Sequence, residues 1–374
     1  MARVLILGGY GNFGKRIAER LGQSHGGIEL LIAGRNLDRA ARLCAQLQPG
    51  ALPGSRLRGV RLDMDAPTFA DELAALAPDI VIHTSGPFQG QDQRVPMACI
   101  QAGAHCIDLA DDRRYVCAIR QLDEPAKARG VLLISGASSV PGLSSTVIDH
   151  FCGEFARLET IDFAIAPGNR AEVGEATLEA ILSYTGRPFR VLQQGRWVER
   201  HGWMNPRRLD FGGPVGRRWL ANIDIPDLEL FPQRYPGVQS VRFQAGLELP
   251  VLHHIMVALA GLARVRLVDS WSGWGRRMLR ARQPLMAFGS DVGGMRIELA
   301  GRDHQGERRT LQWTLYAEQG VGPYIPTLSA IILAGKLLRG ELTERGAVPC
   351  LGLYSLAEFD VEASRLGIYQ RVTR

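Results

Sequence analysis

The chain opens on a change of hydrophobic pattern. Residues 4–7 (VLIL) are four consecutive apolar residues, which is typical of a strand buried on both faces of a sheet. A glycine-rich segment follows, and after it Phe13, Ile17 and Leu21 recur at the four-residue spacing of a helix with one apolar face. This order of strand, glycine turn and helix predicts the first unit of a parallel α/β sheet.

The same alternation continues along the first part of the chain. We expect strands at 29–33, 60–63, 79–84 and 103–109, helices at 37–47 and 67–76, and one more helix around Pro96. Strands that alternate with helices in this way predict an α/β fold, a doubly wound parallel sheet of the Rossmann type over residues 1–150.

The second part of the chain has a different pattern, with short strands and few helices. Strands are expected at 161–166, 189–192, 196–198, 238–248, 295–299 and 310–316, a hairpin at 194–195, and helices at 176–183 and 252–262. We predict a second, α+β domain with a mixed sheet over residues 151–324, which binds the substrate and mediates a homodimer. A helix at 327–338 predicts that residues from about 325 to 374 pack back on the first domain.

Composition excludes several classes of protein. The chain has 374 residues, 46% of them hydrophobic and 22% charged, as in a soluble globular protein with more than one domain. The net charge of +6 comes from arginines spread along the chain, without a nucleic-acid-binding motif, so no nucleic acid is expected as a partner.

The cysteines and the apolar stretches indicate the cellular compartment in which the protein is found. The six cysteines form no C-x-x-C pair and nothing indicates a metal site, so we expect reduced thiols in a cytoplasmic protein. The first residues enter a strand directly, without the regions of a signal peptide. The apolar stretch 251–263 is shorter than the ~18 residues of a membrane span, so we expect a buried or interfacial helix there.

The glycine-rich segment 9–14 (GYGNFG) matches the pattern G-x-G-x-x-G. Gly9 would permit the tight turn, Gly11 the approach of a pyrophosphate to the backbone, and Gly14 the close packing of helix and strand. The following helix N-terminus would attract the phosphates. We therefore predict dinucleotide binding, the alternative being a glycine turn without a ligand. The predicted contacts are Gly9, Tyr10, Gly11, Asn12, Phe13 and Gly14.

The end of the second strand indicates which dinucleotide binds. An NAD enzyme places an acidic residue about 20 residues after the glycines to bind the ribose 2′-hydroxyl, whereas this chain has Arg35 and Asn36 there. Arg35 can pair with a 2′-phosphate and Asn36 can donate to it, which favours NADP(H) over NAD(H). Alternatively, Asn36 only caps the next helix and Arg35 is a solvated surface charge.

Two further strand ends supply candidate cofactor contacts. Asp63 ends the third predicted strand and could face the adenine amino group, although a loop-capping role is an equal alternative. Ser85, Gly86 and Pro87 follow the fourth strand. Ligands of such sheets lie beyond the carboxyl ends of the strands, so we expect these three residues beside the ribose or nicotinamide.

Four segments together resemble a known family. GGYGNFG, AGRN, SGPF and CIQAGAHCIDLADD, in this order and spacing, are similar to the NADP-binding domain of the saccharopine dehydrogenase family. The resemblance covers residues 3–145 and continues more weakly at 140–143 and 335–349. It implies an NADP-dependent oxidoreductase that acts on an imine derived from an amino acid or, as in related enoyl reductases, on a polarised alkene.

The chain also departs from the family pattern on the side where the substrate is expected. Cys106 stands where the family usually has tyrosine, and Asp111 and Asp112 stand where it usually has glycine and glutamate. These changes argue against saccharopine itself as the substrate and leave the expected cofactor unchanged.

Catalytic residues are less evident than cofactor contacts. Asp112 follows the fifth strand and is the best-placed candidate for a proton donor, with a helix cap as the alternative. His254 could reach the cleft, but a histidine on an apolar helix is more often a core residue. The sequence therefore favours hydride transfer to a small-molecule substrate, the alternative being an NADP(H)-binding scaffold or sensor without turnover.

Overall fold

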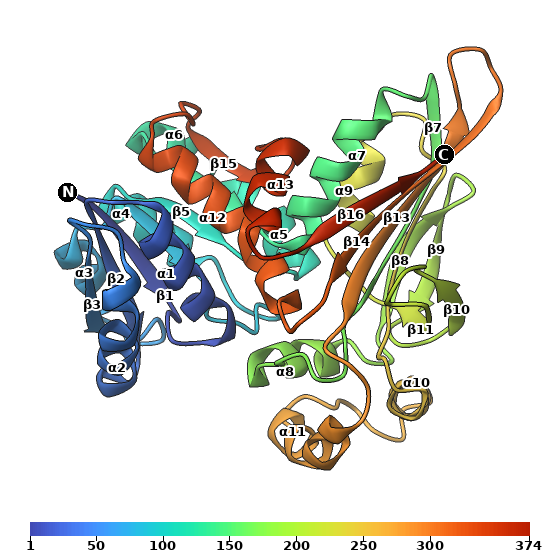
Figure 1. The fold of residues 1–374 in the computed structure, drawn as a ribbon, viewed down its shortest axis with the longest axis horizontal. Coiled ribbons are helices and arrows are strands. Elements are labelled where there is room, and N and C mark those ends of the chain that lie inside the picture. Colours follow the sequence, from blue (N-terminus) through green and yellow to red (C-terminus); the bar gives the residue numbers. More distant parts are fainter. The chain divides into compact units, whose positions relative to one another are not determined.

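The computed structural model describes all 374 residues, and the chain divides into two compact units (Figure 1). Unit 1 contains Met1–Leu143 and Tyr324–Tyr354, and unit 2 contains Ser144–Pro323 and Ser355–Arg374. Each unit is built around its own seven-stranded sheet.

Unit 1 contains a fully parallel sheet. Its strands are β1 (Ala2–Leu7), β2 (Ile28–Gly34), β3 (Arg56–Arg61), β4 (Ile80–His83), β5 (His105–Asp108), β6 (Leu132–Ser135) and β15 (Gly346–Pro349). They lie in the order β15-β6-β5-β4-β1-β2-β3, so the chain reverses direction across the sheet at β1 and β4. This is the doubly wound Rossmann arrangement that the sequence predicts.

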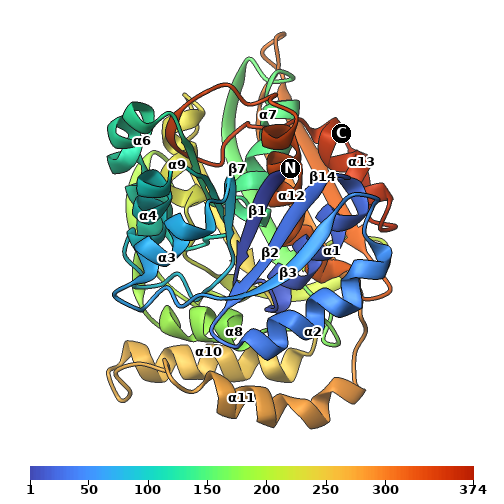
Figure 2. The ribbon, with the colours of Figure 1, turned by 90° about the vertical axis from the view of Figure 1, so that its left-hand side faces the viewer.

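Helices form two layers around this sheet (Figure 2). They are α1 (Asn12–Ser24), α2 (Leu37–Leu47), α3 (Phe69–Leu76), α4 (Arg94–Ala102), α5 (Arg113–Ala118), α6 (Asp123–Arg129) and α12 (Ile325–Leu338). One layer joins α1 to α2 and α12, and another joins α3 to α4 and α6.

The apolar run of β1 is explained by these two layers. Leu5 and Leu7 pack in the core cluster that contains Phe69 of α3, and Val4 and Ile6, whose side chains point to the opposite face, are also fully buried. A strand covered on both faces leaves no position for a polar residue.

The third strand differs from its prediction. It runs from Arg56 to Arg61 rather than over 60–63, because it lies at the edge of the sheet and only Leu57 and Val60 are buried. The exposed residues Arg56, Arg58 and Arg61 interrupt the apolar pattern, so the strand has no continuous apolar run. Asp63 consequently lies two residues beyond the strand.

Unit 2 contains a mixed sheet, as predicted. Its strands are β7 (Arg157–Ala166), β10 (Arg207–Asp210), β11 (Arg217–Asn222), β12 (Ser240–Ala245), β13 (Gly293–Arg302), β14 (Arg308–Ala317) and β16 (Tyr369–Thr373). The order is β10-β11-β12-β7-β13-β14-β16, in which only β12 and β7 are parallel neighbours.

A separate hairpin and six helices complete unit 2. The hairpin joins β8 (Pro188–Gln193) to β9 (Arg196–His201) through Gln194 and Gly195, whose φ angles of 51° and 74° are those of the predicted tight turn. The helices are α7 (Ser144–Cys152), α8 (Glu175–Ser183), α9 (Asp227–Arg234), α10 (Pro250–Arg264), α11 (Gly275–Arg282) and α13 (Leu356–Ser364).

The C-terminal segment does not follow the prediction for residues 325–374 as a whole. Residues up to Tyr354 belong to unit 1, but Ser355–Arg374 belong to unit 2. There β16 pairs with β14, and Val372 lies opposite Trp313 in that ladder. The sequence YQRVT has no strict alternation of polar and apolar residues, since Gln370 and Arg371 are adjacent, and it is too short to be recognised as a strand by itself.

None of the helices is both long enough and apolar enough to cross a bilayer. All six cysteines are free, and no three side chains of histidine, cysteine, aspartate or glutamate are grouped so that they could hold a metal ion.

Candidate functional site

The glycine turn between β1 and α1 is held against β2. The backbone N–H groups of Gly8 and Gly9 both donate to the carbonyl oxygen of Ala33 at 3.0 Å, and Gly11 N–H donates to the Gly8 oxygen at 2.8 Å. Gly8 has a φ of 78°, so it is the residue that needs the freedom of glycine for the turn, not Gly9 as the sequence suggested.

Gly9 and Gly14 are required by close packing. A Cβ atom on Gly9 would lie 2.8 Å from the Ile6 oxygen and 2.9 Å from Cγ2 of Ile32. A Cβ atom on Gly14 would lie 2.5 Å from the Gly8 oxygen, so helix α1 packs directly against the turn.

No side-chain cap accepts a hydrogen bond from the first backbone N–H groups of α1. Its N-cap residue is Gly11, which supplies no capping side chain, and the first turn contains no acidic residue. The first backbone N–H groups of a helix have no acceptor within the helix and carry partial positive charge. The turn can therefore receive an anionic group such as a pyrophosphate.

Tyr10 connects this turn to the end of β2. Its hydroxyl accepts a hydrogen bond from Asn36 N–H at 3.0 Å, and its ring lies so close to Gly34 that a Cβ atom there would be 2.6 Å from it. The Arg39 guanidinium lies over the ring, 4.8 Å from its centroid. Arg35 is exposed beside them and forms no ion pair.

Asn36 caps helix α2, as the alternative interpretation held. Its Oδ1 atom accepts a hydrogen bond from Arg39 N–H at 2.9 Å. This contact uses the acceptor of the side chain, while the amide nitrogen keeps its capacity to donate to an anion. Capping and phosphate binding are thus compatible at this residue.

The end of β4 lies at the same turn. A Cβ atom on Gly8 would lie 2.6 Å from Ser85 Oγ, and Thr84 Oγ1 donates to the Leu7 oxygen at 2.8 Å. The side-chain amide of Gln91 donates to the oxygens of Ser85 and Pro87 at 2.8 and 2.6 Å. These contacts hold the Ser85-Gly86-Pro87 segment beside the glycine turn.

His83 supports this segment from the core. Its side chain is fully buried, with Nδ1 accepting from Ser85 N–H at 3.3 Å and Nε2 lying 3.3 Å from Gln91 Oε1. Burial lowers the pKa of His83 to about 4, against the raising effect of Gln91. The neutral ring therefore carries its proton on Nε2 at neutral pH.

Asp63 forms a local turn. Its Oδ1 atom accepts from Asp65 N–H at 3.2 Å, which is the loop-capping geometry considered as one alternative. The neighbouring Leu62 N–H donates to the Gly34 oxygen at 3.1 Å, so the Asp63 loop begins next to the end of β2.

Asp108, at the end of β5, is a buried charge that the sequence analysis did not select. Its Oδ1 atom accepts three hydrogen bonds, from Gly136 N–H at 2.8 Å and from Ala110 N–H and Ser135 Oγ at 3.0 Å each. Burial nevertheless raises its pKa to about 6. A carboxylate directly after the apolar residues of a buried strand is the signal that could have identified it.

This pKa makes the stability of unit 1 depend on pH in a testable way. Because the pKa of Asp108 rises from 3.8 to about 6 on folding, its stabilising contribution is complete below pH 4 and is lost as the pH rises through 6. Asp108→Asn keeps an acceptor oxygen but does not titrate. We expect the melting temperature of the variant, relative to the wild type, to rise between pH 4 and 6.5.

The difference between the two proteins is the informative quantity. His83 has a pKa lowered to about 4 and changes stability in the opposite direction over the same range, but it does so in both proteins and cancels. A melting-temperature difference that is constant from pH 4 to 6.5 would contradict the interpretation of Asp108.

The predicted catalytic residues lie in different units. Asp112 in unit 1 caps α5, its Oδ1 accepting from Tyr115 N–H at 2.8 Å, and burial raises its pKa. His254 in unit 2 is exposed, and its Nδ1 donates to the Pro250 oxygen at 2.7 Å. Its neighbour His253 is fully buried between Trp203 and Trp219.

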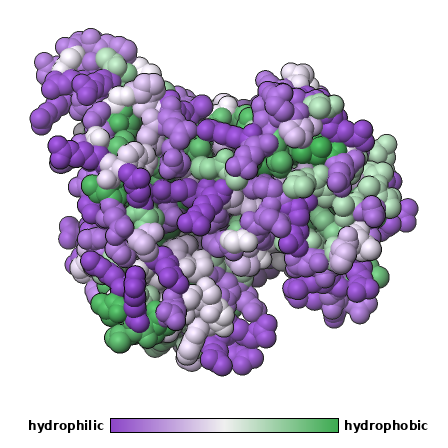
Figure 3. Space-filling model, turned by 180° about the vertical axis from the view of Figure 1, so that it is seen from behind, coloured by the Kyte–Doolittle hydropathy of each residue, from purple (hydrophilic) through white to green (hydrophobic).

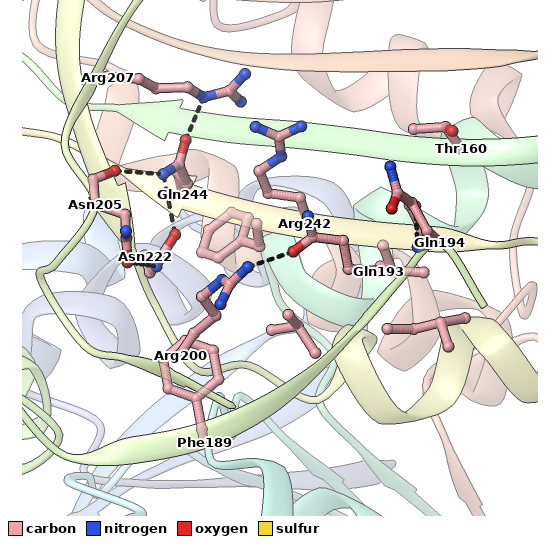
Figure 4. Close-up of a pocket in the computed structure, with 15 residues that line it drawn as sticks. Thr160, Phe189, Gln193, Gln194, Arg200, Asn205, Arg207, Asn222, Arg242 and Gln244 are labelled. Carbon is pink, nitrogen blue, oxygen red and sulfur yellow. Dashed lines mark hydrogen bonds between the residues drawn. The ribbon is translucent and has the colours of Figure 1, made fainter. Parts of the chain in front are cut away.

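Unit 2 has a pocket of about 500 Å³ between the β8–β9 hairpin and the sheet (Figure 4). Its polar wall contains Arg200, Arg207 and Arg242, and Figure 4 shows Arg207 bonded to Gln244, which also donates to Asn222 Oδ1 at 3.0 Å. Arg207 and Arg242 both pair with the carboxylate of Asp162, at 2.5 and 3.4 Å, so much of the positive charge of this wall is already compensated. The arginines and amides of the wall lie on separate strands between residues 200 and 244 and form no sequence motif.

Comparisons with known proteins agree with this geometry. Residues 4–134 match the family model described as the saccharopine dehydrogenase NADP binding domain. A segment of 116 residues is 31% identical to the human saccharopine dehydrogenase-like oxidoreductase. The match covers 29% of this chain and 27% of the human protein. The chain thus aligns with only about a quarter of that relative.

A solved structure shares the fold of the complete chain. The apo saccharopine dehydrogenase (L-Glu forming) of Saccharomyces cerevisiae aligns with 100% of this chain and 99% of its own, with a TM-score of 0.70 and 14% sequence identity. The resemblance inferred from the four sequence segments is therefore confirmed. Residues 4–134 are thus similar to the NADP-binding domain of the saccharopine dehydrogenase family.

Proposed function

We propose that the protein is an NADP(H)-dependent oxidoreductase that transfers a hydride to or from an imine derived from an amino acid, or an enoyl group. The observation that carries this proposal is the connection of the glycine turn to the end of β2 through Tyr10, which leaves Arg35 exposed where an NAD enzyme has an acidic residue. The human relative that matches 29% of this chain is itself named an oxidoreductase.

Each part of the turn has a proposed role toward the cofactor. Gly9, Tyr10, Gly11, Asn12, Phe13 and Gly14 receive the pyrophosphate at the N-terminus of α1. Arg35 and Asn36 bind the 2′-phosphate, Asp63 lies toward the adenine, and Ser85, Gly86 and Pro87 lie toward the ribose and nicotinamide. NADPH bound in this way supplies the hydride, and the protein supplies orientation and a proton.

Asp112 is the proposed proton donor, with His254 as a second candidate. Burial raises the pKa of Asp112, which increases its protonated fraction near neutral pH. Its Oδ1 atom is engaged with Tyr115 N–H, so the other carboxyl oxygen would carry the proton.

The activity is tested by following NADPH absorbance with substrates of two classes. One set contains imines formed from amino acids and oxo acids, and the other contains enoyl thioesters. We expect consumption of NADPH with one set, at a rate at least about tenfold lower for Asp112→Asn. NADPH binding without consumption by either set would contradict the proposed activity.

The alternative function is a protein that retains NADP(H) without turnover. The capping role of Asp112 favours it, since a carboxylate occupied by a helix cap needs no catalytic explanation. Tight NADPH binding, no turnover with either substrate set, and a change in proteolytic sensitivity on binding would support a sensor.

We also propose a cytoplasmic homodimer that associates through unit 2. The sedimentation coefficient of the purified protein would distinguish a dimer from a monomer.

A further inference from the structure

Exposed apolar side chains are concentrated in one short part of unit 2. Of the 14 large hydrophobic residues that are exposed along the chain, seven lie within residues 251–288, about a tenth of its length. They are Val251, Ile255, Leu262, Val265, Leu267, Trp274 and Phe288. Single exposed apolar residues are ordinary, but such a concentration indicates an interaction surface.

Helix α10 has two apolar faces. His253, Met256 and Ala260 are buried against the unit. On the opposite side Val251, Ile255, Ala258 and Leu262 follow one another at helical spacing, and all four are exposed. Figure 3 shows hydrophobic residues gathered at the lower left, where α10 lies in this view, with hydrophilic residues beside them.

Positive charge borders this outer face. Residues 251–288 contain six arginines and one acidic residue, Asp269. Helix α11 carries four of the arginines, and Figures 1 and 2 show it beside α10 at the same end of the unit. The guanidinium of Arg277 lies over the exposed ring of Trp274, 5.0 Å from its centroid, and Arg266 and Arg280 form no ion pair.

The segment is held firmly in place. Glu179 of α8 accepts hydrogen bonds from Gly273 N–H and Gly275 N–H at 2.7 Å each, and the buried Trp271 donates from Nε1 to the Leu259 oxygen at 2.9 Å. Arg282 donates to the Ala171 oxygen at 3.1 Å. The apolar and basic side chains therefore project from an ordered support.

We propose that this α10–α11 surface, the exposed residues of 251–288, binds to an anionic lipid bilayer. An apolar stripe bordered by arginines, with a tryptophan at its edge, is the composition of helices that lie in the headgroup region. The near absence of acidic residues gives charge complementarity to anionic headgroups rather than to a surface of mixed charge. The inference is independent of the proposed NADPH chemistry.

The test is flotation of the purified full-length protein with lipid vesicles. We expect recruitment to vesicles of phosphatidylcholine mixed with phosphatidylglycerol, little recruitment to phosphatidylcholine alone, and release when the salt concentration is raised to about 0.5 M. The double variants Ile255→Ser/Leu262→Ser and Arg277→Glu/Arg280→Glu should each bind about tenfold more weakly or worse.

Matched substitutions outside the surface control for nonspecific effects. Val361→Ser replaces an exposed apolar residue of α13, and Arg308→Glu reverses an exposed charge of β14. Both should float like the wild type, and all variants should keep the wild-type melting temperature and NADPH affinity.

Three outcomes would overturn the proposal. The first is absence of binding to the anionic vesicles, and the second is equal loss of binding in the control variants. The third is conversion of a wild-type dimer to a monomer by Ile255→Ser/Leu262→Ser, because a second copy of the chain would then cover this surface.

Discussion

Replacing Arg35 with alanine is expected to weaken NADPH binding by about 1.5–3 kcal/mol, the usual value for a hydrogen bond to a charged group, while NADH binding hardly changes. Arg35 is exposed and forms no ion pair, so the substitution removes no contact that supports the fold. The 2′-phosphate is the only group that distinguishes the two cofactors, and a guanidinium is well suited to bind it.

Titration calorimetry with both cofactors measures this effect. Arg42→Ala is the matched control, because Arg42 is also exposed and lies one turn beyond Arg39 in α2. The control should bind both cofactors normally. Equal losses of NADPH and NADH affinity in Arg35→Ala, or no loss of either, would rule out the proposed role of Arg35.

Gly11→Ala is expected to reduce NADPH affinity at least tenfold, about 1.4 kcal/mol, with only a modest change in the melting temperature of the cofactor-free protein. Gly11 has an ordinary φ of −75°, so alanine introduces no backbone strain there. Its Cβ atom would meet one atom, the Gly8 oxygen at 3.0 Å, which a small shift of the turn can relieve. The added methyl group would instead occupy the space proposed for the pyrophosphate.

Two other glycines of the same segment distinguish cofactor contact from folding. Gly22→Ala in α1 is the matched control, since its Cβ atom would make ordinary contacts at 3.7 Å and should leave affinity unchanged. Gly14→Ala should unfold the turn, because its Cβ atom would lie 2.5 Å from the Gly8 oxygen and 2.7 Å from Gly9 Cα. Unchanged NADPH affinity in a well-folded Gly11→Ala protein would contradict dinucleotide binding at this turn.

The sequence predicted five of the seven strands of unit 1 and missed β6 and β15, each only four residues long. A run such as residues 4–7 has few alternatives to a central parallel strand, and Asn36 correctly marked the start of helix α2 at Leu37. Edge strands were less predictable. β3 contains three arginines and β16 contains an adjacent glutamine and arginine, so neither strand shows a continuous apolar run or a strict alternation.

The residues of the candidate site were predictable only where they directly follow a recognisable strand. The glycine turn and Arg35 follow strands directly, whereas Asp108 gains its raised pKa from burial, against the lowering effect of the donors at Ser135 and Gly136. The role of Gly8 was missed because it precedes the motif, and its positive φ is a property of the turn that residue spacing does not encode. The arginines of the unit 2 pocket lie on three different strands, β9, β10 and β12, so no local pattern reveals that they line one pocket.

The return of Tyr324–Tyr354 to unit 1 has a consequence for biosynthesis. Strand β15 completes the parallel sheet beside β6, and α12, which is buried along most of its length, packs against α1. During translation, the first 143 residues therefore leave the ribosome before α12 and β15, which pack against them, have been synthesised. The nascent N-terminal segment must keep an open sheet edge and an uncovered helix face while the whole of Ser144–Pro323 is translated.

The fold of unit 1 can consequently be completed only after residues 324–354 have been synthesised. Fragments that end near residue 143 lack both β15 and α12, and they would expose the edge of β6 to pairing with other chains. Cofactor-binding fragments of this protein should therefore be built by joining the two separated segments of unit 1 through a short linker, not by truncation.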